Sequence, residues 1–186
     1  MNLPNRLTMA RIILIPVFMT FLLLQIPRGH DLFPHQDVVA AIIFILAAAT
    51  DGLDGYIARK RNQVTNLGKF MDPLADKLLV SAALISLVEL GQVTAWVAWI
   101  ILAREFAVTG LRAIAAVDRV VISASKLGKI KTVSQVIAIS AILLHDWPLS
   151  LIGLQIGQPF LYIALFFTII SGVDYLLKAR TLLQHK

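Results

Sequence analysis

The sequence predicts an all-α integral membrane protein with six transmembrane helices. Of its 186 residues, 58% are hydrophobic and 15% are charged, and the mean hydropathy is +0.80. A soluble domain of this length has about a quarter of its residues charged. Six apolar stretches each have about the 20 residues that a helix needs to cross a bilayer. Cations concentrate in alternate connections between these stretches, as expected for a multi-pass protein.

The expected helices cover residues 7–27, 37–58, 72–90, 93–115, 129–147 and 155–177. They use most of the chain, so we expect a single membrane domain over residues 1–186. The first stretch resembles a signal peptide, but Gln25-Ile26-Pro27-Arg28 offers no small-residue cleavage site, which favours a retained span. Gly91 and Pro148 lie where the chain should turn between helices.

The connections indicate the orientation. The N-terminal segment, the second and fourth connections and the tail are rich in cations: Arg6, Arg11; Arg59, Lys60, Arg61, Lys69; Arg119, Lys126, Lys129, Lys131; Lys178, Arg180, Lys186. The first connection has only Arg28, and the third and fifth have no cation. This pattern predicts a cell-membrane protein with both termini cytoplasmic. It also explains the net charge of +6, so we expect no nucleic-acid partner.

Four aspartates lie where ionisable groups are costly, by about 2.5–3.5 kcal/mol each on insertion scales. Asp51 and Asp54 are three residues apart, and Asp72 and Asp76 are four apart, so each pair shares one helical face. The short linker makes the two helices antiparallel neighbours, and both pairs can face one point near the cytoplasmic surface. Oxygen ligands alone, without His or Cys, indicate Mg²⁺ or Mn²⁺, and two ions are plausible.

Simpler interpretations of single residues stay open. Asp72, before Pro73, could cap a helix whose first turn contains the proline. Asp51 could pair with a nearby cation, Arg59 or Lys77. The small residues Gly52, Gly55 and Ala58 could either admit a ligand or allow close helix packing.

The motif resembles that of the CDP-alcohol phosphotransferase family, D-x2-D-G-x2-A-R-x8–9-G-x3-D-x3-D. Its fixed positions are all present: Asp51, Asp54, Gly55, Ala58, Arg59, Gly68, Asp72 and Asp76. The resemblance implies six helices around a polar cavity open to the cytoplasmic side, usually in a homodimer. It implies that the four aspartates bind two metal ions, with Asp76 also the base, and that Gly55, Ala58, Arg59 and Gly68 line the CDP site. The reaction would be in-line attack of an alcohol on a CDP-activated lipid, without a covalent enzyme intermediate.

Five cations further along suit an anionic acceptor, because Arg and Lys bind phosphate well: Arg104, Arg112, Lys126, Lys129 and Lys131. The lysines could instead reflect topology alone, and Arg104 could form an internal pair with Glu105 or a motif aspartate. Glycerol 3-phosphate is the simplest phosphorylated acceptor. The segments Asn2–Thr8, Arg104–Phe106 and Gly128–Thr132 resemble bacterial family members that form phosphatidylglycerophosphate from CDP-diacylglycerol, which implies that Asn5 and Thr8 touch the cytidine diphosphate.

Other interpretations differ in acceptor or in class. Inositol phosphate fits the cations equally well, whereas serine or phosphatidylglycerol would leave them less well explained. A transporter lined by carboxylates is the alternative from a different class. Against it, the acids cluster near one face, and the sequence has no evident inverted repeat with broken helices.

Overall fold

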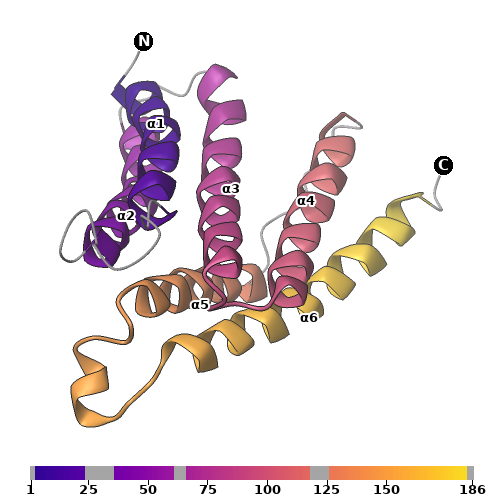
Figure 1. Cartoon of the computed structure of the whole chain (residues 1–186). Helices are drawn as coiled ribbons and strands as arrows, with labels where there is room; N and C mark the ends of the chain where they lie inside the picture. The colour runs from indigo at the N-terminus through magenta and orange to yellow at the C-terminus, as the bar shows by residue number, and fades with distance from the viewer. Residues whose placement is uncertain (1–2, 24–35, 61–65, 118–125, 184–186) are drawn as a thin grey trace.

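The structure, a computed structural model, describes residues 3–23, 36–60, 66–117 and 126–183 (Figure 1). Within these ranges, side chains are described except at 3–4, 51–60, 66–67, 69–70, 116–117, 126 and 178–183. The helices are α1 (Leu3–Leu23), α2 (Gln36–Lys60), α3 (Asn66–Glu89), α4 (Ala95–Val117), α5 (Lys126–Leu143), the short 3-10 helix η1 (Leu149–Ile152) and α6 (Gly157–Leu183). The described ranges contain no strand, which confirms the all-α prediction.

Two of the helices are long and apolar enough to cross a membrane, judged by length and composition. They are α1, over Asn5–Leu23, and α6, over Gly157–Leu177. In α2 the apolar stretch is shorter, Gln36–Thr50. Charged side chains interrupt the other three helices: Asp72, Asp76 and Lys77 in α3, Arg104, Glu105 and Arg112 in α4, and Lys126, Lys129 and Lys131 in α5. Six spans therefore remain a prediction, and nearly all of these interrupting residues belong to the candidate site.

Three pairs of helices pack most extensively. α1 packs against both α2 and α3, and α5 runs alongside α6, while α4 contacts α3 and α6. In Figure 1, α3 and α4 stand upright and α5 and α6 cross obliquely beneath them. The start of α1, the start of α3 and the end of α4 lie on the same side of the molecule. This is the side that the sequence predicts to be cytoplasmic.

Small residues and a few large apolar ones fill the interfaces between helices. Ala40, Ala83 and Ala138 are fully buried, which lets helix backbones approach closely. The rings of Phe18 on α1 and Phe44 on α2 lie 6.0 Å apart, centroid to centroid. This core holds the helices that carry the candidate site in fixed relative positions.

The two turns expected at Gly91 and Pro148 are present. After α3 the chain turns at Gly91, which lies in the left-handed region at φ 70°, and the N–H groups of Gly91 and Gln92 donate to carbonyls of the last turn of α3. Pro148 lies between α5 and α6, immediately before η1. In the same connection Asp146 Oδ1 accepts hydrogen bonds from the N–H groups of Ile156 (3.1 Å) and Gly157 (2.7 Å) at the start of α6.

Candidate active site

The second half of the motif lies on the first turns of α3. Gly68 is buried, and Asp72 and Asp76 are half-buried and one helical turn apart. The helix begins at Asn66 and continues through Pro73 to Glu89. Asp72 is therefore inside α3, and the interpretation of Asp72 as a helix cap is wrong.

α1 brings two predicted site residues to this part of α3. Thr8 is fully buried, and its hydroxyl donates a 2.6 Å hydrogen bond to Asp72 Oδ1. Asn5 is also buried and lies three residues earlier, on the same face of α1. Thr8 was expected to touch the cytidine diphosphate, and its described contact is with an expected metal ligand. This hydrogen bond brings the start of α1 to the second half of the motif.

The first half of the motif lies at the end of α2. Helix α2 continues through Asp51, Asp54, Gly55, Ala58 and Arg59 to Lys60, so the three-residue spacing of the two aspartates is helical, as predicted. The side chains of these five residues lie outside the described part. Among the side chains that are described, no group of three or more His, Cys, Asp or Glu could hold a metal ion. The four-carboxylate metal site remains a prediction, and its oxygen donors suit Mg²⁺ or Mn²⁺.

A cavity of about 440 Å³ opens between α3, α4 and α5. Asp76 and Lys77 line it from α3, and Arg104, Glu105 and Arg112 line it from α4; Gly128, Lys129, Lys131, Thr132 and Val133 complete it from α5. It thus joins a motif aspartate to four of the five cations predicted to bind the acceptor phosphate. The fifth, Lys126, begins α5, and its side chain lies outside the described part.

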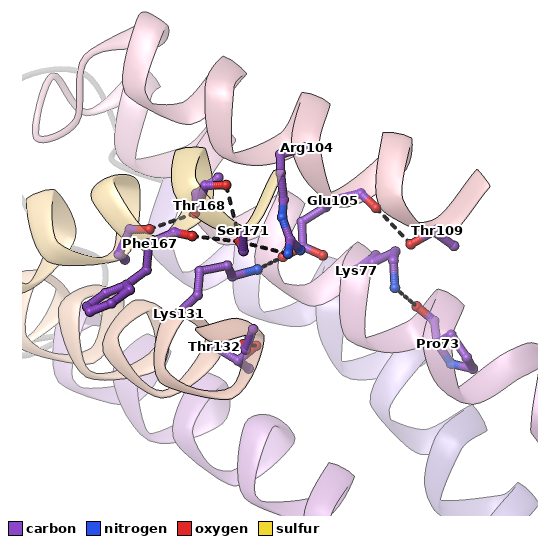
Figure 2. A network of polar contacts seen from close by, with 12 residues as sticks. Pro73, Lys77, Arg104, Glu105, Thr109, Lys131, Thr132, Phe167, Thr168 and Ser171 are labelled. Atoms are coloured by element: carbon purple, nitrogen blue, oxygen red, sulfur yellow. Dashed lines mark hydrogen bonds and ion pairs between the residues drawn. The ribbon is translucent and has the colours of Figure 1, made fainter. Parts of the chain in front are cut away.

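Helix α6 contacts both arginines of the cavity, and Figure 2 shows Arg104 beside Ser171 of α6. Arg104 Nη2 donates to Ser171 Oγ at 2.8 Å, and Ser171 in turn donates to the Phe167 carbonyl at 2.6 Å. Both guanidinium groups stack over the ring of Tyr175, with Cζ at 5.5 Å for Arg104 and 5.0 Å for Arg112. Arg112 also donates a hydrogen bond to the Tyr175 hydroxyl. These contacts fix the direction of both guanidinium groups, which sit at the ends of long and flexible side chains.

Lys131 and Glu105 form an ion pair across the cavity wall. The Lys131 side chain is 2% exposed and that of Glu105 17% exposed, so the pair is shielded from water. The alternative pairing of Arg104 with Glu105 is not the one observed, because Glu105 contacts Lys131 and Arg104 contacts Ser171. Breaking such a buried pair costs about 3–5 kcal/mol. An anionic ligand that binds Lys131 must therefore either share its ammonium group with Glu105 or replace Glu105 as its partner.

Sequence reasoning missed the residues that support the cations. Ser171 and Tyr175 lie in the last apolar stretch, where they were counted only as part of a membrane span. Thr168, Ser171 and Tyr175 recur at intervals of three and four residues, and all three are buried. A polar stripe of this period on an otherwise apolar helix is the signal that could have found them, because it marks one face turned toward a polar site.

Comparison with known proteins identifies the family. The family model described as CDP-alcohol phosphatidyltransferase matches residues 1–170. The chain belongs to the CDP-alcohol phosphatidyltransferase family. This confirms the resemblance and the enzyme class that the motif predicts.

Three relatives in this family match nearly the whole chain. A Bacillus subtilis protein named CDP-diacylglycerol–glycerol-3-phosphate 3-phosphatidyltransferase is 50% identical over 182 residues, covering 95% of this chain and 94% of the relative. A Rickettsia typhi protein of the same name is 42% identical, covering 97% of this chain and 98% of the relative. A Mycobacterium tuberculosis protein named probable phosphatidylglycerophosphate synthase is 41% identical, covering 96% of this chain and 81% of the relative.

The CDP-alcohol phosphatidyltransferase match places the cavity within the shared part of the chain. Residues 1–170 include the motif, Asn5 and Thr8 on α1, and every residue that lines the cavity. Ser171 and Tyr175 lie just beyond the matched residues. The family model therefore does not cover the two α6 residues that contact the arginines.

Proposed function

We propose that this phosphatidyltransferase transfers the phosphatidyl group of CDP-diacylglycerol to glycerol 3-phosphate, giving phosphatidylglycerophosphate and CMP. The observation that carries the proposal is the cavity, which joins Asp76 to Arg104, Arg112, Lys129 and Lys131. A carboxylate at the edge of a cluster of cations suits an acceptor with a phosphate at one end and a reactive hydroxyl at the other. The names of the relatives, which specify these two substrates, support the same choice.

In this proposal the acceptor is oriented by its phosphate and activated at its hydroxyl. The arginines stacked on Tyr175 and the lysines of α5 bind the phosphate, while Asp76 accepts the proton of the attacking hydroxyl. The hydroxyl oxygen bonds to the lipid-linked β-phosphorus of CDP-diacylglycerol in line with the bond that breaks. The displaced oxygen leaves with CMP. The cations would raise the reaction rate by holding the acceptor in attacking geometry against the donor.

The four aspartates Asp51, Asp54, Asp72 and Asp76 would hold two divalent ions, Mg²⁺ or Mn²⁺. When bound, the ions neutralise the pyrophosphate and the charge that develops on the leaving group. The oxygen-only donor set and the helical spacing of both pairs support this assignment. The hydrogen bond from Thr8 orients Asp72 and leaves its second oxygen for a cation.

The donor nucleotide would lie against Gly55, Ala58, Arg59 and Gly68, next to Asn5 and Thr8 on α1. The contact between Thr8 and Asp72 supports this location, because it brings α1 to the motif. Gly68 has no side chain, which suits a site at which backbone meets the ligand.

A lipid substrate requires that this site lie at the level of the bilayer. We propose that all six helices cross the cell membrane, with both termini and the cavity mouth on the cytoplasmic side. The two apolar helices α1 and α6 and the alternation of cations between connections support this topology. The homodimer is proposed from the family resemblance alone, and cross-linking in membranes tests it.

The proposed function is tested by CMP release from CDP-diacylglycerol by the purified protein in detergent. Glycerol 3-phosphate, inositol phosphate, serine and phosphatidylglycerol are offered separately, with Mg²⁺, with Mn²⁺ or with a chelator. We expect metal-dependent release with glycerol 3-phosphate alone. Release with another acceptor would keep the chemistry and correct the substrate. No release with any acceptor, from folded protein, would favour a transporter, which needs a sealed vesicle to be assayed.

A further inference from the structure

The basic cavity adjoins a narrow inner space of about 30 Å³ between α3, α4 and α5. Five residues line both spaces: Asp76, Lys77, Glu105, Lys131 and Thr132. The inner space adds apolar residues such as Val80 and Leu102, and one further polar residue, Gln135. It has room for about one or two groups of the size of a water molecule. A phosphate group is too large for it, whereas a hydroxyl group fits.

Gln135 is the polar residue that this inner space leaves unexplained. It lies on α5 one turn after Lys131 and is 2% exposed. Its amide nitrogen Nε2 is buried and has no hydrogen-bond partner among the residues that the structure describes. Buried amide groups are nearly always hydrogen-bonded, because an unsatisfied donor costs about 1–3 kcal/mol. A donor left without a partner beside the reactive carboxylate indicates that a ligand accepts its bond.

The chemistry of the acceptor suggests which atom that is. This step rests on the proposed function. Glycerol 3-phosphate has three polar groups: the phosphate, the terminal hydroxyl that attacks, and the middle hydroxyl. The cations account for the phosphate and Asp76 accounts for the terminal hydroxyl, which leaves the middle hydroxyl without a protein partner. Nε2 can only donate, and a hydroxyl oxygen can accept.

We propose that Gln135 Nε2 donates a hydrogen bond to the middle hydroxyl of the acceptor, so that Gln135 determines specificity for an acceptor that carries this hydroxyl. The residue is placed to do so because Lys131, Thr132 and Gln135 share one face of α5. An acceptor without the middle hydroxyl leaves the amide buried and unsatisfied. Such an acceptor lacks the hydrogen bond that glycerol 3-phosphate gains, so the enzyme favours glycerol 3-phosphate.

The test compares glycerol 3-phosphate with 3-hydroxypropyl phosphate, which differs only by lacking the middle hydroxyl. The measured quantity is kcat/KM for CMP release at saturating CDP-diacylglycerol. We expect the unmodified enzyme to favour glycerol 3-phosphate by roughly tenfold to a hundredfold, the range of one buried hydrogen bond. Gln135→Met keeps the size of the side chain and removes the donor. It should lower kcat/KM for glycerol 3-phosphate by a similar factor, leave 3-hydroxypropyl phosphate within about twofold, and bring the ratio close to one.

Two further variants keep the test decisive. Ser134→Ala alters a buried neighbour on α5 that lines neither cavity, and it should keep the ratio of the unmodified enzyme. Gln135→Leu also removes the donor and stays apolar at this buried position, so it should bring the ratio close to one if Gln135→Met folds poorly.

Equal use of both acceptors by the unmodified enzyme would overturn the proposal without any variant, as would an unchanged ratio in both Gln135 variants. Failure of the proposed function is distinguishable from this, because the unmodified enzyme would then release no CMP with glycerol 3-phosphate.

Discussion

Among single residues, Asp76 is common to the aspartate motif and to the cavity between α3, α4 and α5. It belongs to the motif by position on α3, and it lines the cavity that contains the acceptor cations. Asp72, one turn earlier, faces α1 through its hydrogen bond with Thr8. The two aspartates, four residues apart on α3, therefore have different surroundings: Asp72 contacts α1, and Asp76 lines the cavity.

Replacement of Asp76 tests its role as the base. Asp76→Asn keeps the size of the side chain but cannot take a proton at the attacking hydroxyl, and it weakens the metal site. We expect kcat to fall by roughly 10²–10⁴-fold or more, the contribution of general base catalysis. The measurement is CMP release, with membrane insertion and thermal unfolding as controls for an intact protein. Near-normal turnover would show that Asp76 is neither base nor essential ligand.

At the scale of helices, the contact between α4 and α6 is what positions the arginines. Gly172 on α6 permits it, since a Cβ there would lie 3.2 Å from the Cγ of Arg104. Ser171 and Tyr175 flank this glycine and contact the guanidinium groups. The close approach of the two helices thus provides both the space and the partners for two cations that line the cavity.

Tyr175 is the residue with which to test this support. Tyr175→Phe removes the hydroxyl and keeps the ring, so the KM for glycerol 3-phosphate should rise by about 2–10-fold, as for one hydrogen bond. Tyr175→Leu also removes the ring under both guanidinium groups, and a further rise of several-fold is expected from the lost cation–π contacts. In both variants kcat should change less than KM. Equal falls in kcat with an unchanged KM would contradict the positioning role.

The junction of α5 and α6 can be tested separately from the chemistry. A Cβ at Gly157 would lie 2.7 Å from Cγ1 of Ile142 and 3.1 Å from its backbone nitrogen. Gly157→Ala should therefore lower the free energy of unfolding by about 1–3 kcal/mol, the cost of overpacking, and lower the apparent Tm in detergent. Gly110→Ala is the matched control, because nothing lies within 4 Å of a Cβ at this helical glycine. An equal Tm in both variants would show that the junction yields to a methyl group.

At the scale of the whole molecule, much of the arrangement could be predicted from the sequence. The motif spacing predicts the two helical aspartate pairs, and apolar stretches predict the six helices within a few residues at most ends. The start of α3 was predicted too late, at 72 rather than Asn66, because Lys69 and Asp72 interrupt the apolar pattern of its first turns. Hydropathy marks where a helix is apolar, whereas hydrogen bonding decides where it begins.

The support of the site could not be predicted in the same way. Ser171 is 67 residues from Arg104 and Tyr175 is 63 residues from Arg112, and one sequence does not show which helices pack together. Gln135 has no charge and belongs to no motif, so only its burial beside Asp76 identifies it. These residues contribute through tertiary placement, which patterns along a single helix do not determine.

We propose that the cavity between α3, α4 and α5 binds the phosphate of the acceptor, not that of the donor. Arg112→Ala tests it most directly, with CMP release measured while each substrate is varied at saturating levels of the other. The KM for glycerol 3-phosphate should rise by roughly tenfold or more, the worth of a hydrogen bond to a charged group. The KM for CDP-diacylglycerol should stay within about twofold. An unchanged KM for glycerol 3-phosphate, or a rise in the KM for CDP-diacylglycerol alone, would show that the cavity does not bind the acceptor phosphate.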